Sequence, residues 1–309
     1  MKRGGKIMSS IFGVLALIAL GLGFWSQWSL LGLMNRLDGV LDTGGAQLLV
    51  RGEAYGGDAR QKLNIWAPVD AAPPRAVIVF FYGGSWKMGE RDLYDFAGRA
   101  LAEKGYVVVV ADYRLVPQVR FPGFVEDGAA AIAWTHQNIV RYHGNPDRIF
   151  VAGHSAGAQI GAMVTLDRQW LANAGAPADT IKGFIGLAGP YDFYPFTSDS
   201  ARNAFGHLAD PATSQPIHFA RADAPPMLLL TGSADTTVKP RNSTALADAI
   251  TKAGGKAEQR VYAGIDHSGI IMALARPFRG KAPVIDDVDG FVRRIAFPGA
   301  EPQGKIINR

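Results

Sequence analysis

The sequence predicts an α/β fold, in which a mostly parallel central sheet is flanked by helices. Apolar strand patterns alternate with helical patterns over residues 48–296, without a low-complexity linker or an internal repeat. One apolar run also ends in a Gly-x-Ser-x-Gly turn that is followed at once by a helical pattern. Since α/β domains of about 250 residues are often single, we expect one domain over residues 38–309.

Most of the expected strands are short apolar runs, the last one is an alternating segment, and the expected helices lie between them. We expect strands near residues 48–55, 61–66, 76–82, 106–111, 148–152, 182–188, 226–231 and 258–262. We expect helices near residues 92–103, 125–142, 156–168, 240–253 and 286–296. The early strands are expected to form an antiparallel edge. Residues 190–224 have no clear pattern and are expected to form a short cap, whose aromatic side chains either line an acyl pocket or form the cap's own small core.

Residues 153–157, Gly-His-Ser-Ala-Gly, are the strongest functional signal. They follow an apolar strand and precede the helical pattern Ala158–Val164. In this context the glycines allow a tight turn that exposes the Ser155 hydroxyl, and the helix directs its first N–H groups at a developing negative charge. Ser155 is therefore the predicted nucleophile.

A serine nucleophile needs a base and an acid, which in this arrangement follow it in the order Ser, Asp or Glu, His. Asp235 comes just after the apolar strand 226–231, where ligands bind in open α/β sheets. His267 is the only histidine after Asp235 and lies in the loop after strand 258–262. We predict that Asp235 and His267 complete a triad, with Asp192 as the rival acid.

An oxyanion hole is predicted from the glycine pair that follows strand 76–82. Gly83 and Gly84 let the backbone approach a substrate closely, and the N–H of Ala156 supplies another donor. We assign Trp86 and His154, which neighbour these groups in the sequence, to the substrate pocket.

With these motifs in place, the chain resembles an α/β-hydrolase of the esterase/lipase group related to hormone-sensitive lipase. It is most similar to the branch with a His-Gly-Gly-x-Trp loop, which includes kynurenine formamidases, feruloyl-type esterases and bacterial carboxylesterases. The motifs that carry the resemblance are Tyr82–Trp86, Ala111–Leu115, Phe121-Pro122, Asn145–Ile149, the serine turn, Gly232–Asp235 with Val238, and Asp266-His267. Tyr82 stands where the family usually has a histidine that holds the oxyanion loop by hydrogen bonds.

Residues 1–37 are expected to lie outside the catalytic domain as a signal-anchor. Lys2, Arg3 and Lys6 precede an almost wholly apolar run over residues 7–25, which is long enough to cross a bilayer as an apolar helix. The positive-inside rule then places the catalytic domain in the periplasm, attached to the inner membrane. A cleaved signal peptide, with release into the periplasm, is the alternative.

Composition and motifs exclude several function classes. The chain of 309 residues has no cysteine, so it has no disulfide and no cysteine-ligated zinc. Its net charge of +5 is scattered, without the basic stripe of a nucleic-acid-binding protein. No phosphate-binding loop, dinucleotide-binding fingerprint or zinc-protease motif is present, so we expect neither cofactor nor metal.

These observations predict a serine hydrolase that cleaves small-molecule carboxylic esters of short to medium acyl chain through an acyl-enzyme. An amidase of the formamidase type is the first alternative, because the same triad serves both bonds. A catalytically silent, membrane-tethered binding module is the second. The sequence leaves the oligomeric state open.

Overall fold

The computed structural model describes residues 31–70 and 74–298. Its framework is an eight-stranded sheet with the strand order β1-β2-β4-β3-β5-β6-β7-β8. The strands are β1 (Ala46–Ala54), β2 (Lys62–Pro68), β3 (Arg75–Phe81), β4 (Val107–Ala111), β5 (Gly144–His154), β6 (Ile181–Leu187), β7 (Met227–Gly232) and β8 (Ala257–Tyr262). Each expected strand corresponds to one of these.

Only the β1 end of the sheet is antiparallel. Strand β2 runs antiparallel to both β1 and β4. All neighbouring strands from β4 across to β8 run parallel to one another. Strands β3 and β4 are buried along nearly their whole length, which explains why they are continuous runs of Val, Ile, Phe and Ala. This is the α/β-hydrolase sheet that the sequence predicts.

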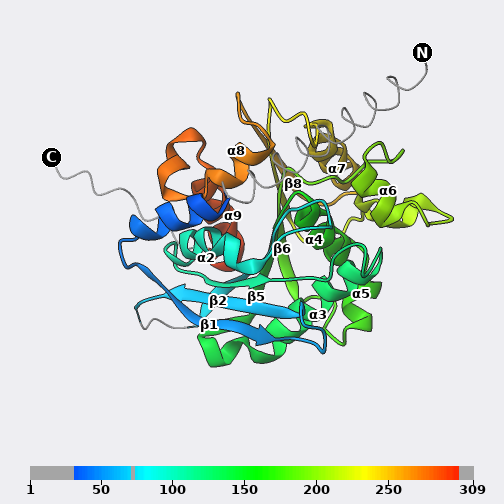
Figure 1. Cartoon of the computed structure of the whole chain (residues 1–309). Coiled ribbons are helices and arrows are strands. Elements are labelled where there is room, and N and C mark those ends of the chain that lie inside the picture. Colours follow the sequence, from blue (N-terminus) through cyan, green and yellow to red (C-terminus); the bar gives the residue numbers. More distant parts are fainter. Residues whose placement is uncertain (1–30, 71–73, 299–309) are drawn as a thin grey trace, which may run out of the picture.

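Helices cover both faces of the sheet (Figure 1), with α2 and α9 on one side and α3, α4 and α5 on the other. The α-helices are α2 (Asp95–Ala102), α3 (Gly123–Asn138), α4 (Ala156–Leu166), α5 (Gln169–Asn173), α6 (Asp199–Phe205), α7 (Arg241–Lys252), α8 (His267–Met272) and α9 (Val284–Ala296). Short 3-10 turns are η1 (Arg91–Tyr94), η2 (Ile139–Tyr142), η3 (Pro211–Ser214), η4 (Pro216–Phe219) and η5 (Arg276–Lys281). The sequence patterns anticipate α2, α3, α4, α7 and α9 but not the shorter α5, α6 and α8.

The segment 190–224 contains α6 and two 3-10 turns, and its aromatic side chains pack on one another. Phe205 lies 5.2 Å from Phe193 and 4.8 Å from Trp86 between ring centroids, and Phe196 stacks on Phe205 at 5.6 Å. The structure therefore shows Phe193, Phe196 and Phe205 in a small aromatic core, which they share with Trp86 and Phe124 from outside this segment.

Residues 31–40 form a helix that packs beside α2; it is the dark blue segment of Figure 1. Met34 is 2% exposed, and the carboxylate of Asp38 is fully buried against Arg99 and Arg276. The expected boundary at residue 37 thus falls inside a helix that rests on the hydrolase domain. The apolar run 7–25, where we expected an N-terminal apolar helix, lies outside the described residues.

Among residues 31–70 and 74–298, no helix has both the length and the apolar character needed to span a bilayer.

Candidate active site

Ser155 sits in a strained turn between β5 and α4. Its backbone has φ 52° and ψ −121°, a conformation that is costly for a residue with a side chain. Close packing on both sides enforces it: a Cβ on Gly153 would meet Gly157 O at 2.4 Å, and a Cβ on Gly157 would meet Phe81 O at 2.2 Å. The amide of Ser155 also donates to Leu187 O at 2.9 Å. The serine turn therefore requires Gly153 and Gly157.

The structure brings Ser155, His267 and Asp235 into one hydrogen-bonded chain. His267 Nε2 is 2.9 Å from Ser155 Oγ, and His267 Nδ1 is 2.8 Å from Asp235 Oδ2. A carboxylate can only accept, so Nδ1 carries the proton and Nε2 is free to accept from the serine hydroxyl. This is the geometry that general-base activation of a serine requires.

Asp235 is buried at the end of β7, and its own backbone neighbours orient it. Its Oδ1 accepts from the amides of Thr237 at 2.9 Å and Val238 at 2.8 Å, which leaves Oδ2 for His267. Asp192, the rival acid, instead lies 3.5 Å from Arg241 at the surface. Asp266 caps the first turn of α8 through Gly269 N. Of these three acids, the structure brings Asp235 to the histidine.

The glycine pair after β3, Gly83 and Gly84, lies directly against the serine turn. A Cβ on Gly83 would be 2.7 Å from His154 Nδ1 and 3.0 Å from Ser155 Cβ, so no larger residue fits without a shift. Gly84 has φ +141° and a Cβ there would meet Met88 O at 2.1 Å. Ala156 is the first residue of α4, where an N–H has no acceptor within the helix. Gly83 and Gly84 line the same cavity as Ser155, and Ala156 follows Ser155 in the chain, so these residues remain the predicted oxyanion hole.

Tyr82, the residue that replaces the usual histidine, is completely buried at the root of this loop. Its hydroxyl donates to Asp112 Oδ1 at 2.7 Å and accepts from Arg60 Nη2 at 2.9 Å. Arg60 also donates to Gly89 O at 2.6 Å, at the far end of the loop. Burial and the nearby Asp112 raise the pKa of Tyr82 well above its usual value, so the hydroxyl keeps its proton. The network joins both ends of the loop to the sheet.

His154 is buried beside the triad. Its Nε2 lies 3.1 Å from the carbonyl oxygen of His267 and therefore donates to it, whereas its Nδ1 has no hydrogen-bond partner among the described residues. Burial, with a smaller effect of His267, lowers the pKa of His154 to about 3. His154 is thus a neutral ring that supports the histidine loop and lines the pocket, as assigned from the sequence.

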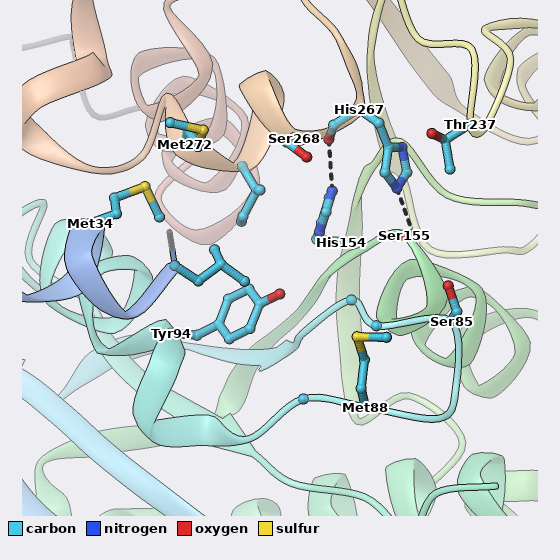
Figure 2. Close-up of a pocket in the computed structure, with 15 residues that line it drawn as sticks. Met34, Ser85, Met88, Tyr94, His154, Ser155, Thr237, His267, Ser268 and Met272 are labelled. Atoms are coloured by element: carbon cyan, nitrogen blue, oxygen red, sulfur yellow. Dashed lines mark hydrogen bonds between the residues drawn. The ribbon is translucent and has the colours of Figure 1, made fainter. Parts of the chain in front are cut away.

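A cavity of about 200 Å³ opens beside Ser155 (Figure 2). Its apolar lining is supplied largely by segments that are far apart in the chain. The lining residues are Leu31, Met34, Gly83, Gly84, Ser85, Met88, Gly89, Tyr94, His154, Ser155, Thr237, His267, Ser268, Ile271 and Met272. Trp86 is not among them; it packs in the aromatic core described above, and its Nε1 donates to Gln159 Oε1 at 3.1 Å.

Sequence reasoning missed the apolar lining contributed by Met34, Tyr94, Ile271 and Met272. One signal was available: Asp266 followed by Gly269 is consistent with a capped helix, which would place Ile271 and Met272 one turn from His267. No comparable signal connects Met34 to the serine turn, because 121 residues separate them.

Three or more His, Asp or Glu side chains that could hold a metal do not come together anywhere in the described part of the chain.

Comparison with known proteins shows the family of the chain. The model of the BD-FAE family matches residues 63–250, which extend from β2 into α7 and include the serine turn. The chain belongs to the BD-FAE family. This places it among α/β-hydrolases related to carboxylic ester hydrolases.

Curated relatives of this BD-FAE protein carry esterase names. It is 29% identical over 264 residues to "Isoprenylcysteine alpha-carbonyl methylesterase ICME" of Arabidopsis thaliana, covering 77% of this chain and 60% of the relative. It is 31% identical over 204 residues to "Esterase LipC" of Mycobacterium tuberculosis, covering 60% of this chain and 50% of the relative. The matches therefore span about half to three fifths of the length of these relatives.

Among solved structures, the BD-FAE protein is similar to "Thermogutta terrifontis esterase 2 phosphorylated by paraoxon". The TM-score is 0.69 at 25% identity, and the match covers 84% of this chain and 98% of that one. The shared architecture thus extends over nearly the whole of that esterase.

Proposed function

We propose that this protein hydrolyses small-molecule carboxylic esters of short to medium acyl chain through an acyl-enzyme on Ser155. The observation that carries the proposal is the unbroken chain from Asp235 through His267 to Ser155, with distances of 2.8 and 2.9 Å. The strained elbow and the adjacent glycine loop support it, as do the esterase names of the relatives.

In the first half-reaction, Ser155 Oγ attacks the ester carbonyl carbon while His267 Nε2 takes the hydroxyl proton. Asp235 stabilises the resulting imidazolium, and the N–H groups of Ala156 and the Gly83-Gly84 loop stabilise the oxyanion. The C–O bond to the alcohol then breaks, and His267 returns the proton to the leaving oxygen. In the second half-reaction, water gives its proton to His267 and attacks the acyl carbon. The acid leaves, and Ser155 regains its proton.

The experiment that tests the proposal is hydrolysis of p-nitrophenyl acetate, butyrate and octanoate by the full chain and by Ser155→Ala. We expect turnover that falls by about 10⁴-fold or more in the variant. p-Nitroanilides of the same acids distinguish the amidase alternative. No turnover of any ester or anilide by the intact, folded chain would instead favour the silent binding module.

We also propose that residues 7–25 anchor the protein in the inner membrane, with the catalytic domain in the periplasm. The apolar run and its basic flank support this. So does the outer face of the helix over residues 31–40, where Leu33, Leu37 and Val40 are exposed. Replacing Leu15 and Leu17 by arginine should release the protein from washed membranes. Recovery of the parent protein in the soluble fraction, to the same extent as the arginine variant, would contradict the proposed membrane anchor.

A further inference from the structure

The wall of the pocket opposite the nucleophile comes partly from the N-terminal helix, residues 31–40. Leu31 and Met34 lie three residues apart on one face of this helix, and both line the cavity. Figure 2 shows Met34 and Met272 across the cavity from Ser155 and His267. The helix therefore buries Met34 at the cavity, whereas Leu33 lies on its exposed outer face.

This helix is fixed to the domain by buried polar contacts. Asn35 Nδ2 donates to Asp92 O at 2.8 Å, and Asn35 Oδ1 accepts from Phe96 N at 2.9 Å. The carboxylate of Asp38 pairs with Arg99 and accepts from Arg276 N at 2.7 Å. Since Asn35 and Asp38 follow Met34 within about one turn, these contacts hold the helix backbone at Met34 against the domain.

The lining has the chemistry of a site for a flexible apolar chain. Met34, Met88 and Met272 are unbranched and adaptable, and no Lys, Arg, Asp or Glu is among the lining residues. The polar groups gather at the Ser155 end. A cavity of about 150 Å³ holds a benzene molecule, so the 200 Å³ here accommodates about eight carbon atoms.

We propose that this pocket holds the unbranched apolar chain of the ester, and that Met34 sets the longest chain that fits. The inference rests on the proposed ester hydrolysis and adds a specificity-determining residue from a helix outside the segment that matches the family. Chain carbons that enter the pocket replace water with methionine and leucine contacts, whereas carbons beyond Met34 have no room.

The test compares chain-length profiles of kcat/KM for the full chain. One series of p-nitrophenyl esters varies the acyl chain, and a second series of alkyl acetates varies the alcohol, so the two series identify which side of the ester occupies the pocket. In the series whose varied chain enters the pocket, we expect kcat/KM to rise about fourfold per methylene and then to fall once the pocket is full.

Two variants of Met34 and one matched control test the residue. Met34→Trp should move the peak to shorter chains, so that kcat/KM falls far more for octanoate than for acetate, because the far end of the pocket is filled. Met34→Ala removes three heavy atoms and should move the peak to chains longer by about two carbons. Leu33→Trp, on the exposed face of the same helix, should leave the profile unchanged.

A purely structural role for Met34 predicts a different result, in which all chain lengths lose activity by the same factor. That uniform loss, an unchanged profile in both Met34 variants, or an equal shift in Leu33→Trp would overturn the inference while the ester hydrolysis stands. Absence of Ser155-dependent turnover for every ester would overturn the proposed function itself, and the inference with it.

Discussion

Gly83 packs so closely against Ser155, the predicted nucleophile, that it leaves no space for a side chain. A methyl group there would press on His154 Nδ1 and Ser155 Cβ and displace the loop. We expect Gly83→Ala to lower kcat about 10²- to 10³-fold with a smaller change in KM, as for loss of one oxyanion donor. Steady-state kinetics check this, with Gly57→Ala as control, because a Cβ at Gly57 meets nothing within 4 Å. Equal kinetics for both variants would contradict the assignment.

Tyr82 makes a separate prediction about the loop. Tyr82→Phe removes the hydroxyl between Asp112 and Arg60 and leaves the buried carboxylate one donor short. We expect a loss of about 1–3 kcal/mol in the free energy of unfolding, measured by urea denaturation. The exposed Tyr194→Phe serves as control and should change little. A Tyr82→Phe variant as stable as the parent would show that the network does not depend on this hydroxyl.

The hydrogen-bonded chain of Ser155, His267 and Asp235 was predictable from the sequence because each residue follows a predicted strand. Order along the chain then left His267 as the one histidine after Asp235. The partners of Tyr82 could not be predicted in this way. Arg60 and Asp112 come from separate segments, and only the folded sheet brings them to one side chain.

Among the secondary-structure elements, the helix over residues 31–40 carries the most unexpected role. Its Asp38 carboxylate is completely buried against two guanidinium groups, so removing it takes the most buried acceptor from Arg99 and Arg276, which keep their ion pairs with Asp42. We expect Asp38→Ala to lower the free energy of unfolding by about 1.5–3 kcal/mol, as for the loss of hydrogen bonds to a charged group. Asp199→Ala, which breaks an exposed ion pair with Arg202, is the control and should have little effect. Similar denaturation midpoints for the two variants would contradict this view of the helix.

The central strands were predictable because helices cover both faces of the sheet and β3, β4 and β7 are continuous apolar runs, whereas the edge strand β8 was predictable from its alternating pattern. The N-terminal helix was not. Its inward residues Leu31, Met34 and Asp38 follow a long apolar stretch, which hides their helical spacing. Helix α8 has only six residues, too few for a periodic pattern, although it begins at His267.

For the whole molecule, the buried His154 predicts how stability depends on pH. In the unfolded chain its pKa is near 6.5, whereas in the folded protein it is about 3, so between these values only the unfolded chain binds the proton. Its contribution to stability is therefore fully present above pH 6.5 and is lost as the pH falls toward 3, with a slope of at most about 1.4 kcal/mol per pH unit. The free energy of unfolding, measured by urea denaturation across this range, should change less per pH unit in His154→Gln than in the parent protein. Identical slopes would contradict a neutral, buried His154.

At the same scale, the sequence predicted the single hydrolase sheet, because the sheet depends on local patterns along the chain. It did not predict the pocket. The cavity joins residue 34 to residues near 88, 94 and 272, and such contacts depend on how distant helices pack.

We propose that Ser155 is a nucleophile activated by His267. Mass spectrometry of the intact protein and of its peptides after treatment with paraoxon tests this role. We expect a single phosphoryl adduct on the peptide that contains Ser155, which is absent in Ser155→Ala and forms far more slowly in His267→Ala. An adduct on another residue, or ester turnover that persists in Ser155→Ala, would contradict the account.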